Sequence, residues 1–187
     1  MVKNKYILLF SILLTIISSC TKSENIHRDL VLQTEGLDFD IPVLPISTDP
    51  VSLAEVSTEM DLNEMIMQNA GQFSTENLQS MKISGFQIEI AVDPEAAEDL
   101  VNNFKAFDYI MVQLKKPNNE LLEVGRILNS AMQTVTLIQV PITTTQELKD
   151  EFSGGVLTYV ITGVASTATT KIMNARAIAQ YKLTLER

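Results

Sequence analysis

Apolar and polar residues alternate along much of the chain, which is the period-two pattern of half-buried β-strands. The clearest example is 173–185, where odd-numbered residues are apolar and even-numbered residues are polar, with Ile178 as the one exception. The segment 37–43 alternates in the same way, and Pro42 and Pro45 place it at a sheet edge. The same reasoning predicts further strands at 51–60, 81–92, 107–115, 121–128, 134–142 and 156–164.

The strand predicted at 81–92 changes phase in its middle. Met81 and Ile83 set one phase, and the apolar residues from Phe86 onwards set the opposite one. The two phases meet at Ser84 and Gly85. A glycine at a phase change predicts a β-bulge, in which one extra residue is inserted into the strand.

Helical signals are short by comparison. Asp93 and Pro94 resemble a helix start, and apolar residues at helical spacing continue from there to Phe104. The segment 144–152 has two apolar residues four apart and precedes a glycine pair, so it also predicts a helix. A third helix is expected over 62–69.

About eight strands with two or three short helical connections predict a mainly β fold. We expect an antiparallel β-sandwich with either immunoglobulin-like or jelly-roll topology. Apolar residues make up 45% of the chain and charged residues 20%, which is typical of a globular protein. The chain holds one cysteine, so no internal disulfide can form and burial must hold the core together.

The first residues form a secretory signal peptide. Lys3 and Lys5 supply a positive start, and residues 6–17 form an apolar run that is too short to span a bilayer. Two small residues, Ser18 and Ser19, then precede Cys20. Residues 1–19 are therefore expected to be cleaved, residues 20–28 to form a polar tether, and residues 29–187 to form a single β-sandwich domain.

Residues Ile17, Ser18, Ser19 and Cys20 together resemble the bacterial lipobox, in which a branched apolar residue and two small residues precede a cysteine. The resemblance implies that Cys20 is lipidated and becomes the mature N-terminus. Several acyl chains bind a membrane firmly, at about 0.8 kcal/mol per buried methylene. The leader, tether and sandwich are similar to small uncharacterised lipoproteins of Bacteroidota, which implies a lipid anchor in the outer membrane, facing the periplasm or the cell surface.

The charge of the chain opposes nucleic-acid binding. Cleavage after residue 19 removes two lysines and no acids, so the 14 basic and 23 acidic residues of the whole chain become 12 and 23, a formal charge of −11. Such a surface repels phosphates and anionic headgroups. We expect partners to be the membrane, through the lipid on Cys20, and a protein of the cell envelope.

No catalytic constellation is recognisable, and no cofactor or metal is expected. The single histidine, His27, falls in the tether, where nothing rigid would hold it beside a nucleophile. Zinc sites of histidine and cysteine are excluded by count. Acidic residues cluster around Asp38, Asp93 and Glu147, but a strand face, a helix start and a helix face explain them. None has the spacing of an EF-hand.

Aromatic and methionine residues offer no clear binding surface. The chain has no tryptophan, and Tyr109, Tyr159 and Tyr181 fall inside predicted strands, where packing is the expected role. Met60, Met65 and Met67 could face a partner, but core packing is the expected use.

The leading hypothesis is a non-enzymatic binding or scaffolding module on the outer membrane. One alternative is a carboxylate-dependent hydrolase acting on glycans, which would need two acids about 5 to 9.5 Å apart with one pKa raised. Another is a carrier that holds an apolar ligand between its sheets, which would need a large internal cavity.

Overall fold

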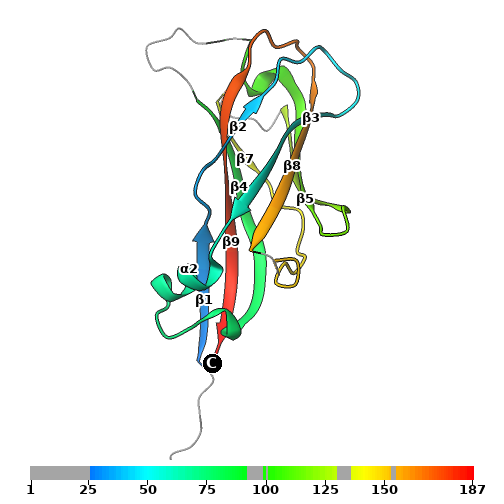
Figure 1. The fold of residues 1–187 in the computed structure, drawn as a ribbon. Helices are drawn as coiled ribbons and strands as arrows, with labels where there is room; N and C mark the ends of the chain where they lie inside the picture. Colours follow the sequence, from blue (N-terminus) through cyan, green and yellow to red (C-terminus); the bar gives the residue numbers. More distant parts are fainter. Residues whose placement is uncertain (1–25, 92–98, 100, 130–135, 153–154) are drawn as a thin grey trace, which may run out of the picture.

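Two antiparallel sheets pack face to face in the computed structural model, which describes residues 26–91, 99, 101–129, 136–152 and 155–187. The predicted β-sandwich is thereby confirmed. The first sheet, called the β9 sheet, contains β1 (His27–Gln33), β2 (Leu37–Ile41), β4 (Leu78–Ile90), β7 (Leu137–Val140) and β9 (Met173–Glu186). The second, called the β8 sheet, contains β3 (Val51–Glu59), β5 (Phe107–Lys115), β6 (Leu121–Leu128) and β8 (Val156–Ala165) (Figure 1).

The order of the strands is that of a jelly roll. From β2 to β9 the chain forms four nested antiparallel pairs, which are β2 with β9, β3 with β8, β4 with β7 and β5 with β6. Further pairing of β4 with β9 and of β5 with β8 completes the two sheets. Of the two topologies left open by the sequence, this order matches the jelly roll.

The strand β1 is an addition in front of the jelly roll. It pairs with the C-terminal half of β9, whereas β2 pairs with the N-terminal half, so the two lie end to end along one edge. Thr34 bridges the gap, since its amide donates to the Ala179 carbonyl at 2.9 Å and its hydroxyl accepts from the Ala179 amide at 3.0 Å. β1 begins at His27, inside the segment expected to be a tether.

Alternation along the strands places one row of side chains in the core. Every odd-numbered residue of β9 from Met173 to Leu185 is buried, as the sequence predicts. The bulge in β4 is also confirmed, because its pairing with β9 shifts register between Ile83 and Gly85. The shift lets both apolar phases of β4 face the interior.

One of the three predicted helices is present as an α-helix among the described residues. Helix α2 (Leu62–Asn69) begins where Asp61 accepts a hydrogen bond from the Glu64 amide at 2.9 Å. The described residues also contain two 3-10 turns, η1 (Thr75–Asn77) and η2 (Phe104–Ala106). The helix expected from Asp93 to Phe104 lies mostly outside the described residues; residues 101–103 form a bend, and Phe104 begins η2.

The helix predicted at 144–152 is wrong. This segment has no regular secondary structure up to Leu148 and then turns. The Leu148 amide donates to the Met81 carbonyl at 2.7 Å, and the Glu147 carboxylate accepts from the Met81 amide. β7 covers only residues 86–89 of β4, so this segment satisfies part of the edge that β7 leaves unpaired.

The two ends of the sandwich differ. β1 begins beside the end of β9, since Ile26 and Arg187 exchange backbone hydrogen bonds at 2.9 and 3.1 Å. Both therefore lie at the end of the molecule where Figure 1 marks the C-terminus. We call this the tether end. The opposite end, called the loop end, carries the connections β2–β3, β4–β5, β6–β7 and β8–β9. No described helix is long and apolar enough to cross a membrane.

Candidate functional site

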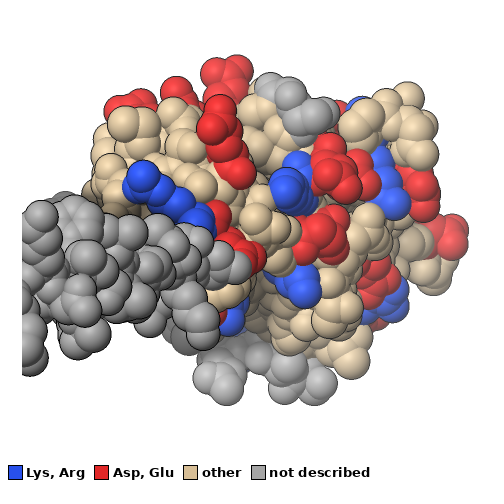
Figure 2. All heavy atoms as spheres, turned by 90° about the horizontal axis from the view of Figure 1, so that it is seen from below, with Lys and Arg blue, Asp and Glu red and all other residues tan. Residues whose placement is uncertain are grey.

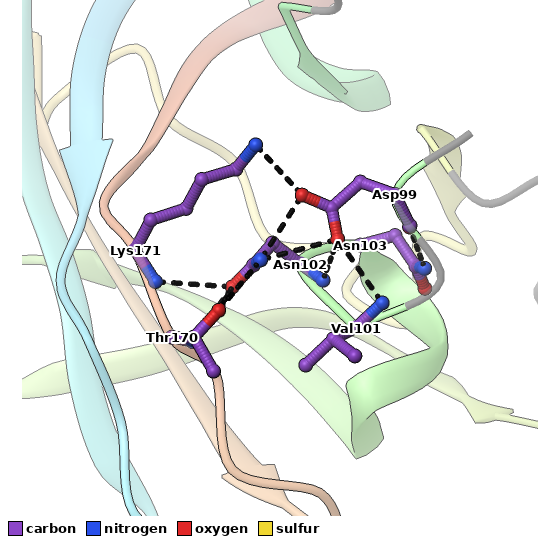
Figure 3. Close-up of polar contacts among 6 residues, drawn as sticks. All are labelled: Asp99, Val101, Asn102, Asn103, Thr170 and Lys171. Carbon is purple, nitrogen blue, oxygen red and sulfur yellow. Dashed lines mark hydrogen bonds and ion pairs between the residues drawn. The ribbon is translucent and has the colours of Figure 1, made fainter. Parts of the chain in front are cut away.

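The loop end contains a polar cluster that joins two loops (Figure 3). Asp99, before β5, lies 2.7 Å from the Lys171 ammonium, which precedes β9. Asp99 also accepts hydrogen bonds from the backbone amides of Val101 and Asn102 at 3.1 and 2.9 Å. The bond from Lys171, followed by those from Asn102, holds the pKa of Asp99 well below its usual range.

Asn102 completes the connection. Its side-chain amide donates to both Asp99 carboxylate oxygens, at 3.1 and 3.0 Å, and its carbonyl oxygen accepts from the backbone amides of Thr170 and Lys171. Each of these polar groups already has a partner. The cluster therefore holds the β4–β5 loop against the β8–β9 loop, and nothing in it points to a ligand.

The other acidic residues have similar structural roles. Asp38 forms a two-pronged ion pair with Arg176, at 2.6 and 3.1 Å, on the outer face of the β9 sheet. Glu147 accepts from the Ser80 hydroxyl at 2.6 Å and fixes the segment beside β4. Asp93 lies outside the described residues. In the part of the chain that the structure describes, no three of the metal-ligating residue types gather in a way that could hold an ion.

Among the described residues, each carboxyl group with a displaced pKa has a lowered pKa, and hydrogen bonds to the carboxylate lower it. Lys182 and Thr184 lower the pKa of Asp29, and Arg176 lowers that of Asp38. Ser80 and the Met81 amide lower the pKa of Glu147, although partial burial opposes them as the largest single influence. A glycosidase acid needs the opposite displacement.

Two tyrosines occupy the middle of the core, as the sequence predicts. The hydroxyl groups of Tyr159 in β8 and Tyr181 in β9 lie 2.6 Å apart, and the Phe86 ring packs edge-on against Tyr159 with centroids 5.1 Å apart. Side chains therefore fill the space between the sheets at this level. Tyr109 is half-buried, and Arg126 lies over its ring at 5.1 Å.

The remaining sequence candidates separate in the structure. His27 lies exposed at the start of β1, 3.5 Å from Glu186. Met60 is buried and Met65 packs against the core, whereas Met67 is 53% exposed, so the three methionines form no continuous surface. Ile17, Ser18, Ser19 and Cys20 lie outside the described residues.

The tether end carries charges of both signs. Figure 2, which views the molecule from this end, shows basic and acidic side chains interleaved. Two of the pairs are Lys182 with Asp29 at 3.0 Å and His27 with Glu186. This mixed surface has no basic patch in that view that would attract phosphates or anionic headgroups.

A groove of about 520 Å³ crosses the outer face of the β9 sheet at the β4 bulge. It is lined by uncharged residues of β4, β9 and the β7 region, which are Ser84, Gly85, Phe86, Gln87, Gln139, Val140, Pro141, Ile142, Ile178 and Gln180. A second, more open hollow of about 700 Å³ lies beside α2, and its lining includes Glu59, Asp61 and Lys149.

No local pattern in the sequence marks the groove glutamines. They come from three strands that are distant in the sequence, so only the sheet pairing brings them together. One signal was present, however. Ile178 breaks the alternation of the last strand, and it lies in this groove.

Comparisons with known proteins give no assignment. No known protein family matches the sequence, and no curated protein matches it. Among solved structures, the chain is similar to one from the structure of turnip yellow mosaic virus, at 14% identity over 86% of this chain and 96% of that chain. The TM-score is 0.26, and a likeness of this extent carries no argument about fold or function.

Proposed function

We propose that the protein is a lipoprotein of the bacterial outer membrane, anchored through Cys20, whose jelly-roll domain is a non-enzymatic binding or scaffolding module. One observation carries the proposal: the first described strand starts at the tether end, and four connections between strands lie at the opposite end. A lipid on Cys20, seven residues before His27, would leave the loop end free to meet a partner.

The chemistry of the described residues favours binding over hydrolysis. Asp38, Asp99 and Glu147 each have hydrogen-bonding partners that stabilise the ionised carboxylate. A general acid would instead need a site that keeps its carboxyl group protonated near neutral pH. The arrangement suits a domain whose polar groups maintain its shape.

Labelling of cells with a radioactive or alkyne-bearing fatty acid tests the anchor. The parent protein should take up label and sediment with membranes, whereas Cys20→Ser, which replaces only the sulfur atom that would be acylated, should do neither. Lipid attachment to other residues, or unchanged membrane retention of an unlabelled Cys20→Ser chain, would overturn the proposal.

A matched control moves the thiol instead of removing it. The double variant Cys20→Ser with Ser23→Cys keeps one cysteine in the same region but outside the lipobox-like sequence. We expect it to remain unlabelled. Labelling of this control would show that any cysteine near the leader is acylated and that residues 17–20 have no special role.

A further inference from the structure

The groove on the outer face of the β9 sheet differs in chemistry from the rest of that face. Two ion pairs flank the groove along β9. Arg176 pairs with Asp38 on one side, and Lys182 pairs with Asp29 on the other. Between these two pairs, the outward residues of β9 are Ile178 and Gln180, and neither is charged. Uncharged groups therefore lie between two ion pairs on this face of the sheet.

Side-chain amides supply most of the polar groups in this band. Gln87 in β4 lies opposite Gln139 in β7 in one ladder and opposite Ile178 in β9 in the other. Gln180 lies one outward position further along β9, and its amide contacts the Gln33 side chain of β1 at 3.4 Å. Each glutamine amide offers both donors and an acceptor, so together they can bind groups that do both.

Ile178 adds an apolar surface in the middle of the amides. It is the one outward residue of β9 that breaks the polar alternation, and it is only partly covered. The core does not require an apolar side chain at position 178. Its neighbours along β9, Ala177 and Ala179, are the residues that face inward. A half-buried isoleucine beside three amides fits a ligand with an apolar face and a polar rim.

The bulge in β4 makes room for one of these amides. Gly85 has no side chain, and a Cβ placed there would lie 2.8 Å from the Gln180 Oε1 atom. The Gln180 side chain thus occupies the space that a larger residue at position 85 would need. The bulge and the glycine therefore let the Gln180 amide lie over β4, in the lining of the groove.

From these contacts we propose that the groove binds a neutral oligosaccharide, which names the ligand class of the binding module proposed above and rests on that function. Sugar hydroxyls donate and accept hydrogen bonds, as the amides of Gln87, Gln139 and Gln180 do. The apolar face of a sugar ring would pack on Ile178. The charge-free lining would leave an ionised ligand without a counter-ion.

A peptide is the less suitable occupant of this site. The backbone groups of β4 and β9 beneath the groove are already used in the sheet ladders, so an extended peptide could not add as a further strand there. Its amide groups would have to be satisfied by side chains alone. A sugar carries its hydroxyl groups on the rim of the ring, where the side-chain amides of the groove can reach them.

Electrophoresis through gels that contain a soluble polysaccharide tests the proposal. The probes are four neutral polymers, which are starch, barley β-glucan, galactomannan and xyloglucan, together with anionic polygalacturonate and unfolded casein. The lipidated protein is run in a detergent that lacks a sugar headgroup. We expect retardation in at least one neutral gel and none with polygalacturonate or casein.

The double variant Gln87→Glu with Gln139→Glu keeps the shape of the groove but replaces amide donors with carboxylates. We expect it to bind the retaining polymer at least about tenfold more weakly, since more than one hydrogen bond is lost. Gln72→Glu adds a charge at the exposed tether end and should bind as the parent does. Retardation in no neutral gel, or retardation that survives the double variant, would overturn the proposal.

A second measurement does not depend on whether the variants fold. Oligosaccharides cut from the retaining polymer are titrated into the parent protein labelled with nitrogen-15, and the side-chain amide signals of its glutamines are followed. Signals of the groove glutamines should shift and that of Gln72 should not. Shifts confined to other glutamines would contradict the site. Because acyl labelling of Cys20 is measured separately, that result would not count against the proposed anchor.

Discussion

At the scale of single residues, Asp99 shows how a partly exposed carboxylate can join two loops. Its partners come from its own loop and from the loop before β9, and the Lys171 ammonium is the strongest of them. The ionised form gains these contacts only in the folded protein. Folding should therefore lower the pKa of Asp99, and the carboxylate should contribute to stability only while it is ionised.

The pH dependence follows from the direction of this displacement. The contribution of Asp99 is present above the usual aspartate pKa, near 4, and is lost as the pH falls through the lower pKa of the folded state. In a carbon-13 titration of the side-chain carboxyl groups, Asp99 should stay ionised at pH 3. In Lys171→Met its pKa should rise. An Asp99 that titrates in the usual range in the parent protein would contradict the cluster.

Substitutions on β9 test which of its residues face the core. Leu183 is fully buried, whereas Gln180, three residues before it, is exposed. Leu183→Asp should bury an unpaired carboxylate and lower the free energy of unfolding by about 4 kcal/mol or more, whereas Gln180→Asp should change it by about 0.5 kcal/mol. Urea midpoints measure both. Equal midpoints would show that the alternation does not separate core from surface.

Gln180 is a better control than the neighbouring Thr184. The Thr184 hydroxyl donates to the Asp29 carboxylate at 2.9 Å, so an aspartate at position 184 would place two like charges together. Alternation alone predicted that Leu183 is buried. It could not reveal the partner of Thr184, which lies in β1, because that pairing depends on tertiary structure.

At the scale of elements, one hydrogen bond connects the two sheets through the core. Tyr159 belongs to β8 and Tyr181 to β9, and burial raises the pKa of both phenols above the usual value near 10. Both hydroxyls therefore stay protonated in the folded protein. The stability that this confers is complete below about pH 10 and is lost as the pH rises towards the higher pKa of the folded state.

A double-mutant cycle measures how strongly the two hydroxyls depend on each other. Tyr159→Phe or Tyr181→Phe alone leaves the other hydroxyl buried without a partner and should cost about 1 to 3 kcal/mol. The double variant should cost less than the sum of the two, since no orphaned hydroxyl remains. Strictly additive changes in the free energy of unfolding would indicate that the hydroxyls do not interact.

Most strands could be predicted because one face of each is buried. The limits of β5 and β6 agree with the alternation. The limits of α2 also agree with the predicted helix, whose start is marked by Asp61. The helical spacing of Leu148 and Phe152 wrongly predicts a helix at 144–152. Pairing of Glu147 and Leu148 with the edge of β4 is a long-range effect that no local pattern contains.

The groove illustrates the same limit. The sequence predicts that Gln87 and Gln180 face outward, and it contains the unusual Ile178. Their meeting with Gln139 depends on the pairing of β4 with both β7 and β9. Register between distant strands is fixed by packing of the whole core, so a single sequence does not reveal it.

At the scale of the whole molecule, the lengths of β9 and of the tether determine how a lipid-anchored domain would be oriented on a membrane. β9 contains 14 residues and so is roughly 45 Å long. The chain from Cys20 to His27 can reach at most about 25 Å. A domain held by a lipid on Cys20 should thus keep its tether end near the membrane, with the loop end well beyond it.

Quenching by spin-labelled lipids tests this central claim most directly. A single cysteine is introduced either at Gln72, whose carbonyl accepts from Arg187 at the tether end, or at Ala168 in the exposed β8–β9 loop, and is labelled with a fluorophore. Cys20 is the chain's own single cysteine and should be blocked by lipid, so each label would be unique. In vesicles that carry the lipidated protein, the Gln72→Cys label should be quenched more strongly than the Ala168→Cys label. Equal quenching at both positions, or stronger quenching at Ala168→Cys, would contradict the account.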